Sequence, residues 1–158
     1  MEYKFYRSYY FQNENTEINL DSLSPEEVYY RFYHEAEIGI DVGERHIDGK
    51  FDTVYYIGGS FCDIVNYHNV NFKDLAFFHT VERLAEFTVI VKTYKNYIFN
   101  TAMIVNCKNN YEEEKISIYN DKFELTEYRE FLSINNECIV GQRIFLPSVW
   151  KLSKEDFY

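Results

Sequence analysis

Four histidines and 26 acidic residues are the side chains of this chain best suited to hold a metal or move a proton. Residues 34–37 and 44–48 each place a histidine beside carboxylates, and imidazole and carboxylate oxygens are ligands for zinc and iron. Neither stretch has the paired histidine or cysteine–histidine spacing of a metal motif. We therefore predict no metal and no cofactor, and interpret both stretches as solvated charged surface.

Three cysteines, Cys62, Cys107 and Cys138, are widely spaced and odd in number. This pattern argues against a disulfide framework and against a CxxC motif. A cysteine nucleophile would need a nearby histidine, such as His68 or His79, to generate its thiolate. Because Cys62 and Cys107 lie in apolar, strand-like segments, we predict that the cysteines are buried, reduced and inert. The sequence favours a role other than catalysis.

The formal net charge of −10 is concentrated at the two ends of the chain. Residues 1–48 hold 11 acids and 4 basic residues, and residues 112–158 hold 10 and 6. The segment between them, with 5 acids and 6 basic residues, is close to neutral. Such a field repels nucleic acid phosphates and favours basic proteins. We therefore expect a basic protein partner and no direct nucleic acid binding.

Tyrosine and phenylalanine account for 30 of the 158 residues, with 16 and 14 copies. So many phenols cannot all be buried with paired hydroxyls, so some tyrosines should lie on the surface beside carboxylates. The first predicted partner-binding patch is an acidic connection between hairpins. It consists of Tyr111, Glu112, Glu113 and Glu114. The second is the acidic stretch around an Asp-Gly turn, with Asp41, Glu44, Asp48 and Asp52.

Three helices are predicted from capping and periodicity. Ser24, Pro25 and Glu27 form a capping-box pattern that starts a helix reaching about Glu37. Residues 72–86 repeat apolar side chains at helical spacing and predict a second helix. Thr126 is suited to cap a short helix that ends near residue 132.

Alternating apolar residues and turn dipeptides predict the strands. They cover residues 3–11, 53–57, 88–91, 97–105, 116–119, 123–125 and 138–145, with Gly58-Gly59 as a bend between two extended pieces. Together with the helices, these strands predict a single α+β domain over residues 1–158. Its mainly antiparallel sheet packs against two main helices and one short helix.

No run of about 18 apolar residues is present, and the N-terminal residues lack the organisation of a secretory signal. We expect a cytoplasmic protein without membrane association. Its acidic, tyrosine-rich surface suggests a protein-binding inhibitor that blocks a basic partner. Immunity proteins, antitoxins and phage-encoded inhibitors of defence nucleases are of this kind. One alternative is a ligand-binding or enzymatic domain with an aromatic and histidine-lined pocket; another is a self-assembling protein that uses tyrosine-rich strand edges.

Overall fold

The computed structural model describes residues 2–10, 12, 16–24, 27–108, 113–134, 138–146 and 151–157. Eleven strands, one α-helix and one short 3₁₀ helix make up the regular structure of these residues. The chain is therefore mostly β-sheet, and the predicted α+β fold with two main helices and one short helix is wrong.

The chain divides into two compact units. Unit 1 comprises Met1–Glu82 and Thr93–Ile98, and unit 2 comprises Arg83–Lys92 and Phe99–Tyr158. The elements of unit 1 are β1 (Lys4–Tyr6), the 3₁₀ helix η1 (Leu20–Ser22), β2 (Tyr29–Glu35), β3 (Ile40–Ile47), β4 (Lys50–Gly58), α1 (Phe61–Asn71) and most of β5 (Phe77–Ala85).

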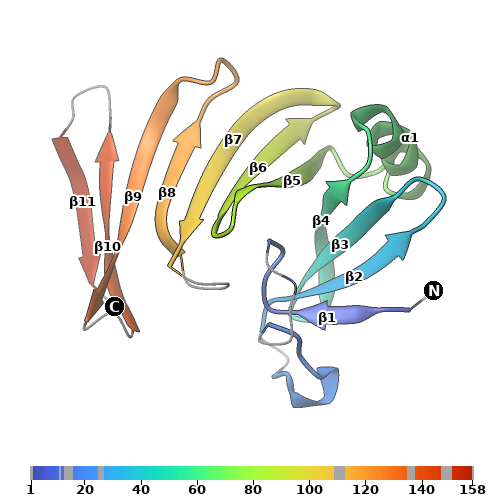
Figure 1. Cartoon of the computed structure of the whole chain (residues 1–158), viewed down its shortest axis with the longest axis horizontal. Coiled ribbons are helices and arrows are strands. Elements are labelled where there is room, and N and C mark those ends of the chain that lie inside the picture. The colour runs from blue at the N-terminus through green and yellow to red at the C-terminus, as the bar shows by residue number, and fades with distance from the viewer. Residues whose placement is uncertain are drawn as a thin grey trace. The chain divides into compact units, whose positions relative to one another are not determined.

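The sheet of unit 1 has the strand order β1-β2-β3-β4-β5 (Figure 1). Strands β1 to β4 pair antiparallel, and the predicted Asp48-Gly49 turn joins β3 to β4. Strand β5 is parallel to β4, with Tyr55 opposite His79. Since parallel neighbours need a crossover connection, α1 between them completes a β-α-β unit.

Helix α1 begins directly after the glycine pair. Gly58 and Gly59 both have left-handed φ angles, of 79° and 70°, which glycine adopts at little cost. Ser60 then caps the helix, because its hydroxyl accepts the Asp63 amide at 3.1 Å. The predicted bend is present. The extended segment expected after it is instead this helix.

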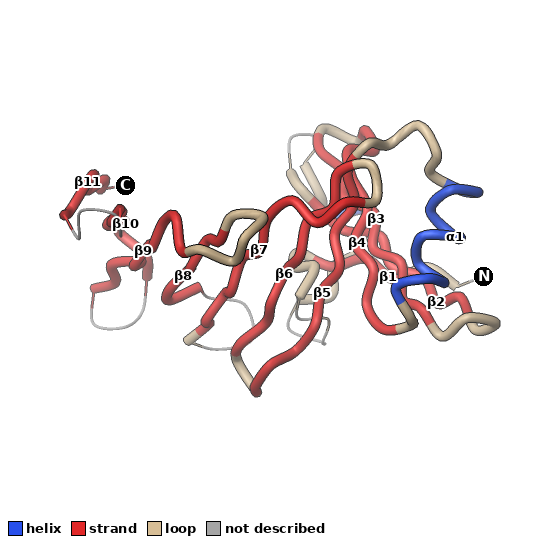
Figure 2. Tube along the Cα trace, turned by 90° about the horizontal axis from the view of Figure 1, so that it is seen from above, coloured by secondary structure: helices blue, strands red, loops and turns tan. Residues whose placement is uncertain are grey.

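The hydrophobic core of unit 1 lies between the sheet and α1, which covers one face of β2–β4 (Figure 2). Strands β2, β3 and β4 contribute alternate residues to this face, as period-two side chains must. The buried members are Tyr33, Ile40, Val42, Val54, Tyr56, Ile64 and Phe78.

The helix predicted from Pro25 to Glu37 is wrong, because most of its described residues form β2. Half of the capping pattern survives without a helix: Glu27 Oε2 accepts the Ser24 amide at 2.9 Å. Residues 29–35 also alternate at period two, and their antiparallel pairing with β3 selects the extended conformation.

The other two predicted helices are wrong for the same reason. Most of residues 72–86 belong to β5, whose pairing with β4 overrides the helical spacing. Residues 126–132 lie within β9 (Leu125–Ile134), which pairs antiparallel with β8 (Glu113–Tyr119). In each case pairing with a neighbouring strand decided the conformation.

Unit 2 contains most of β6 (Thr88–Lys95) and β7 (Ile98–Cys107), together with β8, β9, β10 (Cys138–Leu146) and β11 (Lys151–Phe157). Strands β7 to β11 follow one another as an antiparallel meander (Figure 1). The predicted strands at 88–91, 97–105, 116–119 and 138–145 are confirmed. No helix in the described part of the chain is long and apolar enough to cross a membrane.

Candidate functional site

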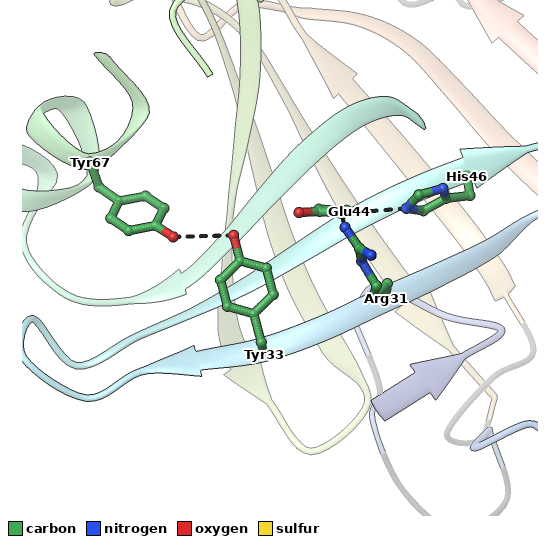
Figure 3. A network of polar contacts seen from close by, with 5 residues as sticks. All are labelled: Arg31, Tyr33, Glu44, His46 and Tyr67. Atoms are coloured by element: carbon green, nitrogen blue, oxygen red, sulfur yellow. Dashed lines mark hydrogen bonds and ion pairs between the residues drawn. The ribbon is translucent and has the colours of Figure 1, made fainter. Parts of the chain in front are cut away.

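A partly buried ion-pair cluster lies across β2 and β3 in unit 1 (Figure 3). Arg31 Nε donates to Glu44 Oε2 at 2.9 Å, and His46 Nε2 lies 3.4 Å from the same oxygen. Glu44 is only 7% exposed, so the guanidinium supplies the compensation that a buried carboxylate requires. Removing Arg31 would leave that carboxylate poorly compensated.

The ring of His46 is held between aromatic side chains. It stacks on Tyr29 with 4.9 Å between centroids and 3° between planes, and lies 6.0 Å from Phe51. Its Nδ1 is buried and has no hydrogen-bond partner among the described residues. A buried polar atom without a hydrogen bond is costly. The stacking on Tyr29 and the contact with Glu44 offset this cost and hold the His46 ring in place.

Two further buried contacts are structural. Tyr33 and Tyr67 share a 3.1 Å hydrogen bond that joins β2 to α1 (Figure 3), and burial raises the pKa of Tyr33 far above its ordinary value. Tyr56 donates to His68 Nδ1 at 2.9 Å, and His68 Nε2 donates to the Leu75 carbonyl at 3.0 Å. Burial lowers the pKa of His68, so this ring is neutral at pH 7.

The arginines of unit 1 are all engaged with carboxylates of the same unit. Arg7 pairs with Glu27 at 3.5 Å, Arg31 pairs with Glu44, and Arg45 pairs with Asp52. Unit 1 holds 15 acidic and 7 basic residues, a net charge of −8, whereas unit 2 holds 11 and 9, a net charge of −2. Most of the negative charge of the protein therefore belongs to unit 1.

A pocket of about 290 Å³ lies in unit 1. Residues of β1, β2 and β3 and of the segment after β1 line it: Glu2, Lys4, Tyr6, Gln12, Phe32, Tyr33, His34 and Asp41. Phe32 and His34 alternate with the core residue Tyr33, so both lie on the face of the sheet away from α1.

Cross-strand contacts hold the lining of this pocket in place. His34 Nδ1 donates to Asp41 Oδ1 at 2.6 Å, and the Tyr6 and Phe32 rings pack edge to face with centroids 5.8 Å apart. The Phe32 ring lies directly over Gly43, where an added Cβ would come within 2.3 Å of its Cζ. The missing side chain of Gly43 therefore makes room for the aromatic floor of the pocket.

The predicted acidic stretch on β3 and β4 occupies several different surroundings. Asp41 lines the pocket, Glu44 is buried beside Arg31, and Asp52 is paired with Arg45. Asp48 is exposed at the turn between the strands. The structure therefore does not gather these carboxylates into one patch.

The other predicted patch begins outside the described residues, which include neither Tyr111 nor Glu112. Glu113 and Glu114 are the first residues of β8 in unit 2, and Glu113 lies opposite Cys107 in the pairing with β7. Glu113 is half-buried and Glu114 is exposed.

The histidines are dispersed over unit 1. His34 lines the pocket, His46 and His68 are buried in separate surroundings, and His79 stacks on Tyr55 at 4.6 Å. No group of three or more histidine, cysteine or acidic side chains placed to hold a metal occurs in the described part of the chain.

The cysteines also differ from one another. Cys107 is buried, as predicted, but Cys62 is exposed on α1, so the prediction of burial is wrong for Cys62. The side chain of Cys138 lies outside the described residues. The helix turned Cys62 outward, whereas a strand at this point was expected to bury it.

Sequence reasoning missed most of the pocket. The alternation in residues 3–11 places Lys4 and Tyr6 on one side of a strand, which is the available signal. The folded sheet determines which strand pairs with these residues and in which register, so the sequence alone could not show the rest of the pocket. The Arg31–Glu44 pair was missed for the same reason, since its partners are 13 residues apart.

No protein-family model, curated protein or solved structure matches this chain.

Proposed function

We propose that this protein binds a basic protein through the acidic surface of unit 1 and blocks that partner's cationic surface. Immunity proteins, antitoxins and phage-encoded inhibitors of defence nucleases act in this way. The supporting observation is the charge of −8 on unit 1, whose arginines all pair with carboxylates of their own chain.

The pairing of the arginines determines which partners the surface attracts. Arginine is the side chain best suited to bind phosphate, because its planar guanidinium binds two oxygens at once. In unit 1 the arginine guanidinium groups instead form ion pairs with Glu27, Glu44 and Asp52. The net field of the unit is negative, which steers basic proteins toward it and repels nucleic acid.

A second candidate function is favoured by the pocket between β1, β2 and β3. Its aromatic floor, with polar side chains converging on it, is a usual feature of a small-molecule site. The His34–Asp41 hydrogen bond also resembles an oriented base. This candidate predicts a ligand that binds with the same affinity whether or not a basic protein is present.

Charge reversal in one unit at a time tests the main proposal. A partner is first captured on the immobilised protein from its source, and association is then measured across a salt series. Glu37→Lys with Asp74→Lys reverses two exposed acids of unit 1; Glu86→Lys with Asp121→Lys makes the same change in unit 2. The unit 1 variant should associate on the order of tenfold more slowly at low salt, and the matched variant should remain close to wild type.

A third variant, Glu113→Lys with Glu114→Lys, tests the patch predicted at the start of β8. If this variant slows association more than the unit 1 variant, the interface lies in unit 2 and the proposed placement is wrong. A captured partner without net positive charge, or equal rates for all variants, would contradict the electrostatic basis of the proposal.

A further inference from the structure

We propose that the pocket between β1, β2 and β3 receives one arginine or lysine side chain of the basic partner. This inference rests on the proposed function and identifies the point on unit 1 at which the partner is anchored. The pocket combines an aromatic floor with carboxylate and amide groups at its rim. Long cationic side chains have matching parts, an apolar stem and a charged head.

The floor of the pocket suits the stem of such a side chain. Tyr6 and Phe32 are 7% and 6% exposed, and their edge-to-face packing holds both rings in place. Gly43 leaves room for the outer end of the Phe32 ring, because an added Cβ would meet Cζ and Cε1 of that ring. An aliphatic stem laid on these rings would remove its own apolar surface from water.

The rim suits the charged head. Glu2 and Asp41 supply carboxylates, and the bond from His34 uses only Oδ1 of Asp41, whose side chain is half exposed. Gln12 Nε2 donates to the Tyr9 carbonyl at 2.6 Å, which leaves its Oε1 as an acceptor. The negative surroundings also act on the floor, because burial and the carboxylates of Glu17 and Asp41 raise the pKa of Tyr6.

Among the described residues of the lining, Lys4 is the one lysine or arginine, and it opposes a cationic ligand. It is exposed and lies on β1 opposite Phe32. Its presence makes a sharp prediction, because removing a like charge from the rim should tighten binding of a cation. A pocket built for an anion would respond in the opposite direction.

The volume favours a single side chain over a larger ligand. Sites for drug-sized molecules range from about 300 to 1,000 Å³. At about 290 Å³ this pocket falls at the lower limit. Protein interfaces commonly place an arginine anchor in such a pocket and surround it with contacts that exclude water.

The test is an NMR titration of the full-length protein with N-acetyl-arginine amide. The matched ligand is N-acetyl-citrulline amide, which has nearly the same shape and no charge. We expect shifts of the amides of Tyr6, Phe32 and Asp41 with the arginine probe, and about threefold weaker binding of the citrulline probe. Equal binding of both probes, or shifts confined to other residues, would overturn the proposal.

Three variants sharpen the test. Asp41→Asn should weaken the arginine probe about threefold, and Lys4→Gln should tighten it about twofold. Asp121→Asn, an exposed position in the turn between β8 and β9, removes the same charge in unit 2 and should leave the affinity unchanged. An Asp41→Asn protein that binds as tightly as Asp121→Asn, or a Lys4→Gln protein that binds more weakly than wild type, would contradict the anchor.

Binding of these variants to the captured partner distinguishes failure of this inference from failure of the proposed function. If Asp41→Asn and Asp121→Asn bind the partner equally while the unit 1 charge reversal slows association, unit 1 is the interface and the pocket is not its anchor. If the charge reversal has no effect but Asp41→Asn weakens the arginine probe, the pocket binds cations and the inhibitor function is wrong.

Discussion

At the scale of single residues, the titratable side chains of unit 1 are controlled by burial and by their nearest partners. His79 on β5 stacks on Tyr55, and its Nδ1 lies 2.9 Å from Thr93 Oγ1. Burial is the main cause that lowers its pKa to about 4, the charge of Arg45 adds to this effect, and Asp52 opposes it. This ring is therefore neutral in the folded protein and becomes a source of acid sensitivity.

We predict that stability falls as the pH is lowered from 6.5 toward 4. In that interval the unfolded chain binds a proton at His79, with an ordinary pKa of 6.5, and the folded protein does not. Protonation therefore favours unfolding, and this residue should remove about 2 kcal/mol of stability between pH 7 and pH 5. Urea unfolding of wild type and of His79→Gln at pH 7 and at pH 5 measures this loss of stability.

The control for His79→Gln is the range above pH 7.5, where His79 is neutral in both folded and unfolded chains. There the difference between the two proteins should not depend on pH. If His79→Gln loses as much stability as wild type between pH 7 and pH 5, the acid sensitivity has another origin.

At the scale of elements, α1 is stabilised more by its N-terminal cap and by core packing than by the helix propensity of its residues. Its residues include Ile64, Val65 and Val70, and β-branched side chains have modest helix propensity. The glycine pair turns the chain, and Ser60 and Asp63 then satisfy groups of the first turn. Packing of Ile64 in the core of unit 1 supplies the remaining stability.

We predict that Ser60→Ala lowers the free energy of unfolding by about 1 kcal/mol, because the Asp63 amide loses its acceptor. Ser24→Ala is the matched variant, since Ser24 stands in a similar sequence pattern that starts no helix. Its side chain is exposed, and the Glu27 bond goes to its backbone amide. Ser24→Ala should lower the free energy of unfolding by less than about 0.5 kcal/mol. Denaturant midpoints with unchanged slopes measure both, and equal losses would contradict this assignment of the cap.

At the scale of the whole molecule, the charge of −10 is the property that no pairing within the chain removes. Like charges in one chain repel one another and oppose compaction, although they keep a protein soluble. The uneven division, −8 on unit 1 and −2 on unit 2, concentrates this repulsion in unit 1.

We predict that adding NaCl stabilises the protein at pH 7, because salt screens this repulsion. The urea midpoint should rise between low salt and about 0.15 M, where the screening length falls to about 8 Å. The Glu37→Lys, Asp74→Lys variant of unit 1 has less repulsion to screen and should respond less. A midpoint that falls with salt would show that attractive ion pairs outweigh the repulsion.

Local turn and strand chemistry made part of the fold predictable from the sequence. Asp48 and Gly49 both adopt left-handed φ angles in their turn, and the β-branched run at 88–91 is extended in β6. The helices were misplaced because residues 29–35 and 77–85 carry patterns compatible with both periods. Pairing of residues 29–35 with β3, and of residues 77–85 with β4, selected the extended conformation in both segments.

The sequence by itself determined the acidity, the abundance of tyrosine and the residue types available for binding, because these depend on composition alone. Only the tertiary structure decided which carboxylates are paired and which line the pocket. Antiparallel register placed Arg31 opposite Glu44 and His34 opposite Asp41. Because a shift of one residue would turn every side chain of a strand to the other face, the pocket and the ion-pair cluster exist only in this register.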